Sequence, residues 1–180
     1  IEPVGKIFDL DIKKIKKNFE INFFSNLEIL KIILETRNKK SNIFLFSGSG
    51  SNGPAAGLSS YTLSKLLLIK LSELISDEYK DINCVTIGPG YIDTKIHQQL
   101  IKNKKKAKKA YKKYLSLKQY NDKSDPFKNI YDLILKCIKY PKLTRGRNFS
   151  SKYDKWKNNF SQLKKNIILD DNYFKLRRKN

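Results

Sequence analysis

The feature that most constrains the fold is a pair of short apolar runs, each of which ends in a turn of small residues. The run SNIFLFS (41–47) leads into GSGSNGPAAGLSS (48–60), and the run DINCVTIGPG (81–90) closes on Gly-Pro-Gly. A continuous apolar run bounded by turn residues is typical of a strand buried on both faces of a parallel sheet. A third, short strand is predicted in RGRNFSS (145–151).

Helical patterns lie between these strands. Apolar residues recur at helical spacing through 9–40 and predict a helix with a wide buried face, capped by Asp11 or Asp9. A second helix is predicted over about 59–79, and a third follows Asp125 in DPFKNIYDLILKCIKY. This alternation predicts an α/β fold with right-handed crossovers and a parallel sheet.

The rest of the chain is more polar. The stretch 95–123 is rich in lysine and is expected to be helical in part, while 151–180 is polar with scattered aromatics and predicts a surface extension. We expect one domain over 1–150 followed by this C-terminal extension. The sequence contains no apolar run of membrane-spanning length and no Cys/His cluster with metal-ligand spacing.

The net charge bears on the binding partners of the protein, and the cysteines bear on the compartment in which it lies. The formal net charge of +21 raises nucleic acid or an anionic surface as a partner. Lysine is scattered along the whole chain beside abundant asparagine and isoleucine, as AT-rich codons would supply, so we expect neither a nucleic-acid nor a membrane partner. Cys84 and Cys137 lie in apolar runs and are expected to be buried free thiols in the cytoplasm. We expect no catalytic role for His97.

Tyr61 and Lys65 form the motif that carries chemistry. At i and i+4 they share one helix face, and a neighbouring ammonium should lower the pKa of a phenol from its ordinary value near 10. Such a tyrosine can exchange a proton with an alcohol or carbonyl oxygen. The pair alone is a weak pattern in a lysine-rich chain. However, the turns after both strands and the start of this helix are expected at one edge of the sheet, where ligands bind.

These motifs resemble the C-terminal part of a short-chain dehydrogenase/reductase. YTLSK resembles that family's Tyr-x-x-x-Lys, GPGYIDT its Pro-Gly-x-x-x-Thr, and FEINFF the helix that supplies an asparagine. IEPVGKIFDLD resembles the loop after the fourth strand, and LTRGRNFSSKYDKW the final strand. The FSGSGSNGPAAG loop and the closing YFKLRR resemble a bacterial subgroup often encoded with surface-polysaccharide genes.

The resemblance implies a Rossmann-like three-layer fold, of which this chain is the C-terminal half, with NAD or NADP as cofactor. It makes Tyr61 the general acid/base, Lys65 the group that lowers the pKa of Tyr61 and binds the nicotinamide ribose, and Asn22 a member of the proton relay. The implied cofactor-binding residues are Tyr61, Lys65, Pro89, Gly90, Ile92 and Thr94.

Two departures from the family pattern stand out. Gly48 occupies the place of the usual catalytic serine, and either Ser47, Ser49 or a backbone N–H is expected to replace it. The glycine-rich cofactor loop is absent, and the chain contains no methionine. We therefore expect a piece of a longer protein, inactive by itself.

The function predicted is NAD(P)-dependent hydride transfer on an alcohol or carbonyl, with a sugar derivative among the candidate substrates. A nucleotide-sugar epimerase or dehydratase, which shares the Tyr-Lys pair, is the alternative enzyme. A basic nucleic-acid- or anion-binding protein without catalysis is the alternative of another class. The stretch 95–123 is expected to form a substrate lid, and the full-length protein a homo-oligomer.

Overall fold

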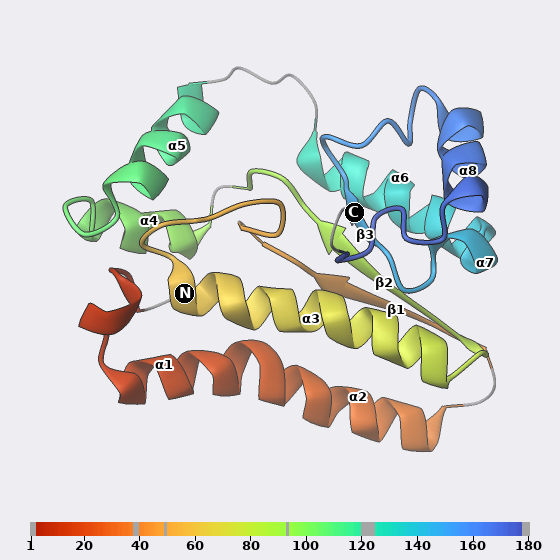
Figure 1. Ribbon diagram of the computed structural model, residues 1–180, viewed down its shortest axis with the longest axis horizontal. Coiled ribbons are helices and arrows are strands. Elements are labelled where there is room, and N and C mark those ends of the chain that lie inside the picture. The colour runs from red at the N-terminus through yellow and green to blue at the C-terminus, as the bar shows by residue number, and fades with distance from the viewer. Residues whose placement is uncertain (1–2, 38–39, 49, 93, 120–124, 178–180) are drawn as a thin grey trace. The chain divides into compact units, whose positions relative to one another are not determined.

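A computed structural model describes residues 3–37, 40–48, 50–92, 94–119 and 125–177 (Figure 1). The chain divides into two compact units. Unit 1 comprises Ile1–Thr36, Gly48–Leu67 and Tyr91–Lys123, and unit 2 comprises Arg37–Ser47, Leu68–Gly90 and Ser124–Asn180. The long helix α3 (Ser59–Glu78) contributes its first half to unit 1 and its second half to unit 2.

Unit 2 contains the predicted parallel sheet. Its strands β1 (Ser41–Phe46), β2 (Ile82–Gly88) and β3 (Asn148–Ser150) lie in the order β1-β2-β3, and both pairings are parallel. All three strands appear where the sequence predicted them. The α/β class and the parallel sheet are therefore confirmed.

The central strand β2 is buried from Ile82 to Ile87, as predicted. Val85 and Ile87 pack in a core with Leu133 and Cys137 of α6 (Pro126–Lys139), which Asp125 caps by accepting from the Phe127 N–H at 2.9 Å. The short helix α7 (Pro141–Thr144) follows α6. Cys84 and Cys137 are both free and buried, and burial raises the pKa of their thiols to about 11 and about 12.

Strand β1 corrects one expectation. Ile43 and Leu45 are buried, but on the other face Phe44 is only partly buried and Phe46 is 42% exposed, so that face is incompletely covered. A continuous apolar run indicates which surfaces a strand can bury. It does not say whether both are covered within the chain at hand.

The C-terminal residues correct another expectation, because they are not only a surface extension. Trp156 is 2% exposed, and Leu163 and Ile167 of α8 (Phe160–Leu169) are 5% and 6% exposed, in the same core as Phe149 of β3. Asn159 caps α8 by accepting from a backbone N–H. Leu163 and Ile167 lie four positions apart and therefore on the same face of α8. This face of a mostly polar helix is apolar enough to be buried.

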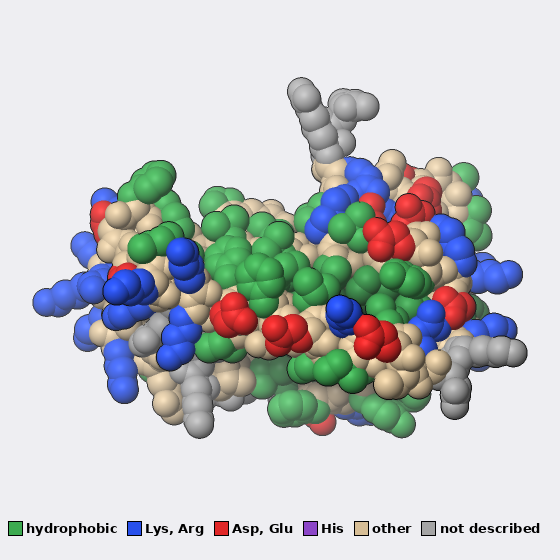
Figure 2. Space-filling model, turned by 90° about the horizontal axis from the view of Figure 1, so that it is seen from below, with side chains coloured by type: hydrophobic (Ala, Val, Ile, Leu, Met, Phe, Trp, Pro, Cys, Tyr) green, Lys and Arg blue, Asp and Glu red, His purple; other side chains and the backbone are tan. Residues whose placement is uncertain are grey.

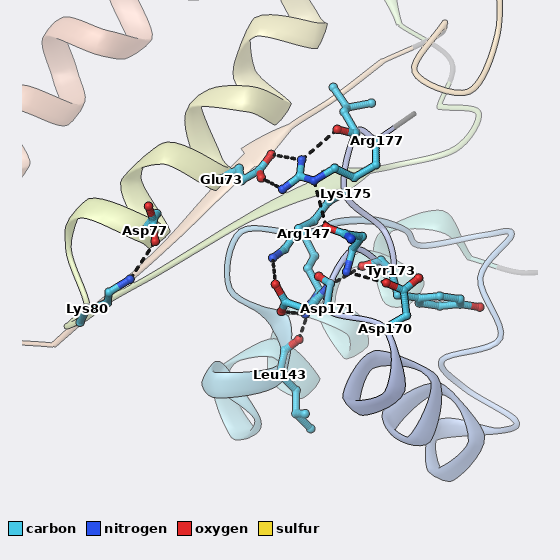
Figure 3. Close-up of polar contacts among 12 residues, drawn as sticks. Glu73, Asp77, Lys80, Leu143, Arg147, Asp170, Asp171, Tyr173, Lys175 and Arg177 are labelled. Atoms are coloured by element: carbon cyan, nitrogen blue, oxygen red, sulfur yellow. Dashed lines mark hydrogen bonds and ion pairs between the residues drawn. The ribbon is translucent and has the colours of Figure 1, made fainter. Parts of the chain in front are cut away.

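Arg147 holds this C-terminal segment beside the sheet (Figure 3). Its side chain is 5% exposed and donates to the carbonyls of Leu143 (2.9 Å), Asp171 (2.7 Å) and Tyr173 (2.5 Å). It also pairs with the Asp171 carboxylate at 3.0 Å. One buried cation therefore satisfies carbonyls from both α7 and the last turn of the chain.

Unit 1 begins with a short 3₁₀ turn (Ile7–Asp9) and a helix in three consecutive parts. These are α1 (Ile12–Phe19), a π-helical turn (Glu20–Phe24) and α2 (Ser25–Thr36). Asp11 caps α1 by accepting from the Lys13 N–H at 2.8 Å. The predicted helix is confirmed, and the π-helical turn within it was not foreseen.

The wide buried face expected for this helix is wrong for this chain. Leu30 is buried, but Ile12, Leu27 and Ile33 are 61%, 39% and 41% exposed. Figure 2 shows hydrophobic side chains gathered in the middle of the face viewed from below. Helical spacing of apolar residues reveals which face is apolar, whereas burial requires a partner surface.

The lysine-rich stretch folds into α4 (Lys95–Lys102) and α5 (Lys108–Gln119). The two helices share a small core, which consists of Val4, Leu58, Leu100, Ala107 and Tyr114. Within the described ranges, no helix is both long and apolar enough to cross a membrane. Among those same residues, no group of His, Cys, Asp and Glu could hold a metal ion.

Candidate active site

Tyr61 lies in the first turn of α3 and is 8% exposed. Two backbone hydrogen bonds hold the loop that precedes Tyr61. The Leu58 N–H donates to the Ala55 carbonyl at 2.9 Å, and the Gly5 N–H donates to the Gly57 carbonyl at 3.0 Å. Gly57 has φ +88°, a conformation that favours glycine. The small residues of this loop therefore fix where α3 starts and where the phenol lies.

Gly48 lies directly against this phenol. A Cβ at position 48 would meet the Tyr61 hydroxyl oxygen and would lie 2.7 Å from Cζ of the ring. The glycine at the position of the usual serine is thus required by the packing, because any side chain there would have to displace Tyr61.

Lys65 stands one turn along α3, with Nζ 6.0 Å from the Tyr61 ring centroid. Burial raises the pKa of Tyr61 above its ordinary value, and burial lowers the pKa of Lys65. The net shift of the Tyr61 pKa is therefore upward, and the lowering expected from Lys65 stays a prediction. The phenol is largely removed from water, so the cost of burying a phenolate exceeds the benefit of an ammonium at this distance. Tyr61 keeps its proton at neutral pH and is suited to act as an acid.

Of the two serines beside Gly48, the structure describes the contacts of one. Ser47 belongs to unit 2 and is 3% exposed; its hydroxyl donates to Asn148 Oδ1 at 3.0 Å, and its N–H donates to the Ile87 carbonyl at 3.0 Å. Its hydroxyl proton is therefore engaged by β3. Ser49 lies outside the described residues. A catalytic role for either serine stays a prediction.

Asn22 lies in the π-helical turn of unit 1. Its backbone carbonyl accepts from Asn26 Nδ2 at 3.0 Å. Within the described part of the chain, its side chain makes no hydrogen bond with Tyr61 or Lys65. Single π-helical turns inside α-helices often mark functional sites. The role of Asn22 in a relay stays a prediction.

The Pro-Gly-x-x-x-Thr motif spans the end of β2 and the start of α4. Pro89 and Gly90 belong to unit 2, and Gly90 has φ +79°, which favours glycine. Ile92 and Thr94 belong to unit 1, where Thr94 is exposed and caps α4. An exposed hydroxyl at a helix start, a buried phenol and a partly buried amine are donors and acceptors that suit the amide and ribose hydroxyls of a nicotinamide riboside.

His97 makes a capping contact that the sequence interpretation missed, and the expectation that it has no catalytic role stays a prediction. Its Nδ1 accepts from the Thr94 N–H at 3.3 Å, and its backbone N–H donates to the Thr94 carbonyl at 2.9 Å. The signal was the spacing Thr-x-x-His, in which the residue at the third helical position turns back on the cap.

The profile of the short chain dehydrogenase family matches residues 1–105. The chain belongs to the short-chain dehydrogenase family. An uncharacterized oxidoreductase of Schizosaccharomyces pombe is 34% identical over 95 residues, which cover 52% of this chain and 38% of that protein. A benzil reductase ((S)-benzoin forming) of Saccharomyces cerevisiae is 30% identical over 109 residues, which cover 56% of this chain and 41% of that protein.

Solved structures of short-chain dehydrogenases confirm the fold. A short chain dehydrogenase/reductase from Saccharomyces cerevisiae is 25% identical with a TM-score of 0.73, and the match covers 88% of this chain and 64% of that one. A 4-hydroxyisoleucine dehydrogenase complexed with NADH is 19% identical with a TM-score of 0.57, covering 83% of this chain and 63% of that one, and supports the fold alone. This chain spans about two fifths of the length of the curated relatives it matches.

Proposed function

We propose that the full-length protein is an NAD(P)H-dependent reductase that converts a carbonyl to an alcohol. The observation that carries this proposal is the Tyr61 phenol, buried at the start of α3 with Lys65 one turn away. A phenol that is protonated at neutral pH can give its proton to a carbonyl oxygen, whereas oxidation of an alcohol would need the phenolate, which burial disfavours.

Bound NADH or NADPH would supply the hydride to the carbonyl carbon. Tyr61 Oη gives its proton to the carbonyl oxygen, and the Lys65 ammonium stabilises the phenolate that remains. Asn22 supports the return of a proton to Tyr61. Lys65 would also hold the nicotinamide ribose and Thr94 the nicotinamide amide, with Pro89, Gly90 and Ile92 forming the turn before Thr94.

The carbonyl oxygen needs a hydrogen-bond donor in place of the usual serine. Gly48 presents only its backbone beside the Tyr61 hydroxyl, and Ser47 donates to Asn148. We therefore favour a backbone N–H or Ser49 for this task over Ser47. A backbone donor is fixed in position by the fold and can stabilise a developing oxyanion as a side chain does.

The substrate class follows from two likenesses. The relative described as a benzil reductase suggests α-diketones, and the resemblance of two segments to a polysaccharide-associated bacterial subgroup suggests a sugar derivative. The relatives described above come from yeasts, so α-diketones are tested first. A nucleotide-sugar epimerase or dehydratase would use the same Tyr-Lys pair without net oxidation or reduction of its substrate.

The test is Tyr61→Phe in the full-length protein, with Tyr131→Phe as the matched control, because Tyr131 is 60% exposed on α6. Reduction of benzil and of nucleotide sugars is followed by the consumption of NADH or NADPH. Tyr61→Phe should lower turnover by at least about a hundredfold and leave the dissociation constant of the dinucleotide within about twofold. Turnover within a few-fold of the parent would exclude Tyr61 as the acid.

A further inference from the structure

His97 is held in a reciprocal contact with Thr94 at the start of α4. The Thr94 N–H donates to His97 Nδ1. In return, the backbone N–H of His97 donates to the Thr94 carbonyl and to the Thr94 side chain. Since Nδ1 is the acceptor, a neutral imidazole carries its proton on Nε2. Glutamate and glutamine usually occupy this third helical position in such capping boxes, and neither changes charge near neutral pH.

Aromatic packing fixes the imidazole ring in this orientation. Its centroid lies 5.0 Å from that of Tyr114 at an interplanar angle of 22°, and 4.8 Å from that of Tyr91 at 46°. Tyr114 is 4% exposed and belongs to the same small core as Leu58 and Leu100. The ring cannot turn away from Thr94 without disturbing this core.

We propose that His97 is a positioning residue for Thr94 and makes that position depend on the protonation of the imidazole. Neutral His97 holds the Thr94 amide at the cap of α4, and protonated His97 releases it. The consequence for dinucleotide affinity rests on the proposed function, in which Thr94 contacts the nicotinamide.

The charges around the ring set the direction of the effect. A protonated Nδ1 cannot accept the Thr94 N–H, and a cation in the first turn of a helix opposes the helix dipole. The phenols of Tyr91, before α4, and Tyr114, on α5, contact the ring. Residues 95–119 include ten lysines and no aspartate or glutamate, so the formal charges of α4, α5 and the turn between them are all positive.

Two variants separate the acceptor from the ring. His97→Gln keeps a side-chain oxygen at the usual capping-box position but does not titrate. His97→Phe keeps a ring between Tyr91 and Tyr114 but removes the acceptor. If His97 serves only as a packed ring, the Thr94 amide should be better protected from exchange in His97→Phe than in His97→Gln. If His97 acts through its acceptor, the amide should be better protected in His97→Gln.

The primary measurement needs no cofactor. In the full-length protein, the Thr94 amide resonance and the His97 ring protons are followed by NMR from pH 5 to pH 8. The two should change with the same midpoint, and the protection of the Thr94 amide from exchange, corrected for intrinsic rates, should fall by roughly fivefold on the acid side. His97→Gln should show high protection and no midpoint, and His97→Phe low protection throughout. A parent whose Thr94 amide ignores the His97 titration, or a His97→Phe variant with full protection, would overturn the proposal.

The second measurement is the dissociation constant of NADH and NADPH over the same pH range. The parent should bind several-fold more weakly on the acid side, and His97→Gln should bind equally at both ends. The Thr94 amide could change with the protonation of His97 while the dinucleotide affinity stays constant. That result would refute the role of Thr94 in the proposed function, but the link between His97 protonation and the Thr94 amide would remain. The other adverse result has two parts: Thr94→Ala weakens dinucleotide binding, and the affinity has the same pH profile in the parent and in His97→Gln. It would show that His97 protonation does not control the position of Thr94.

Discussion

The backbone of Gly48 and the hydroxyl of Tyr61 occupy adjoining space, with no room for a Cβ between them. This contact joins the turn after β1 to the first turn of α3 within unit 1. It explains how a chain can lack the usual serine and still keep a defined environment around the phenol. It also means that the missing serine cannot simply be restored.

Gly48→Ala and Gly48→Ser should each displace the phenol. Because a misplacement of about 1 Å can cost about a hundredfold in rate, we expect carbonyl reduction to fall by that order. The matched control is Gly53→Ala in the same loop, where an added Cβ meets nothing within 4 Å. Steady-state kinetics of the three variants decide the matter. A Gly48→Ser variant with parental or higher activity would show that the phenol moves aside at little cost.

The ion pair between Glu73 and Arg177 should stabilise unit 2 in a defined pH window. The hydrogen bond from Arg177 is the main cause that lowers the pKa of Glu73 from 4.5 to about 2 (Figure 3). Since the folded pKa is depressed, the stabilisation is complete above pH 4.5 and is lost as the pH falls towards 2. Glu73→Gln should lower the free energy of unfolding by about 1 kcal/mol at pH 7, with the difference vanishing at acid pH.

The control for this pair is Lys80→Gln, which breaks the contact between Lys80 and Asp77. Their side chains are 72% and 83% exposed, so solvent should screen the contact and the variant should match the parent. Urea denaturation at several pH values measures both variants. A Glu73→Gln deficit that persists unchanged at pH 2 would show that its cause is packing and not charge.

Arg147 should be the most costly polar residue of unit 2 to replace. Arg147→Met leaves the carbonyls of Leu143, Asp171 and Tyr173 without their donor, so we expect a loss of about 3 kcal/mol. Lys142→Met, at an exposed position of α7, is the control. Hydrogen exchange at the Asn148 amide, which donates to the Phe174 carbonyl at 3.0 Å, reports whether the C-terminal segment has separated from β3. Unchanged exchange there would contradict this account.

Local signals in the sequence were enough to predict the sheet and the position of Lys65 one helical turn from Tyr61. The continuous apolar run of β2, the Asp125 cap of α6 and the i, i+4 spacing of Tyr61 and Lys65 depend only on neighbouring residues. Each can be recognised without knowing what lies across the fold. The cap at Asp11 was predicted on the same basis.

Features that depend on distant contacts could not be predicted in this way. The exposure of Ile33 and the burial of Trp156 are set by whether another surface covers the side chain. The sign of the Tyr61 pKa shift required a comparison between desolvation and the Lys65 charge, which needs the burial of both groups. The contact of Gly48 with Tyr61 joins residues on different elements, so the sequence showed only that the serine was missing.

The lysines between α4 and α5 should tune substrate binding without affecting the chemical step. Lys104, Lys105 and Lys106 precede Ala107, which is buried against the position of Gly57 just before the Tyr61 helix. The turn that carries these lysines is therefore anchored, within unit 1, to the loop that sets the start of α3. An anionic substrate that approaches Tyr61 would experience their charge, and salt would screen it.

Replacement of all three lysines by glutamine should raise KM several-fold for an anionic substrate and weaken the dependence of KM on salt. The rate of hydride transfer in single turnover at saturating substrate should stay within about twofold, because the variant removes binding and not an interaction made only in the transition state. The control replaces Lys13, Lys14 and Lys17, which are exposed on α1 and carry the same total charge. Loss of the chemical step with an unchanged KM would refute a binding role. Equal behaviour of the two triple variants would show that the lysines between α4 and α5 form only a solvated surface.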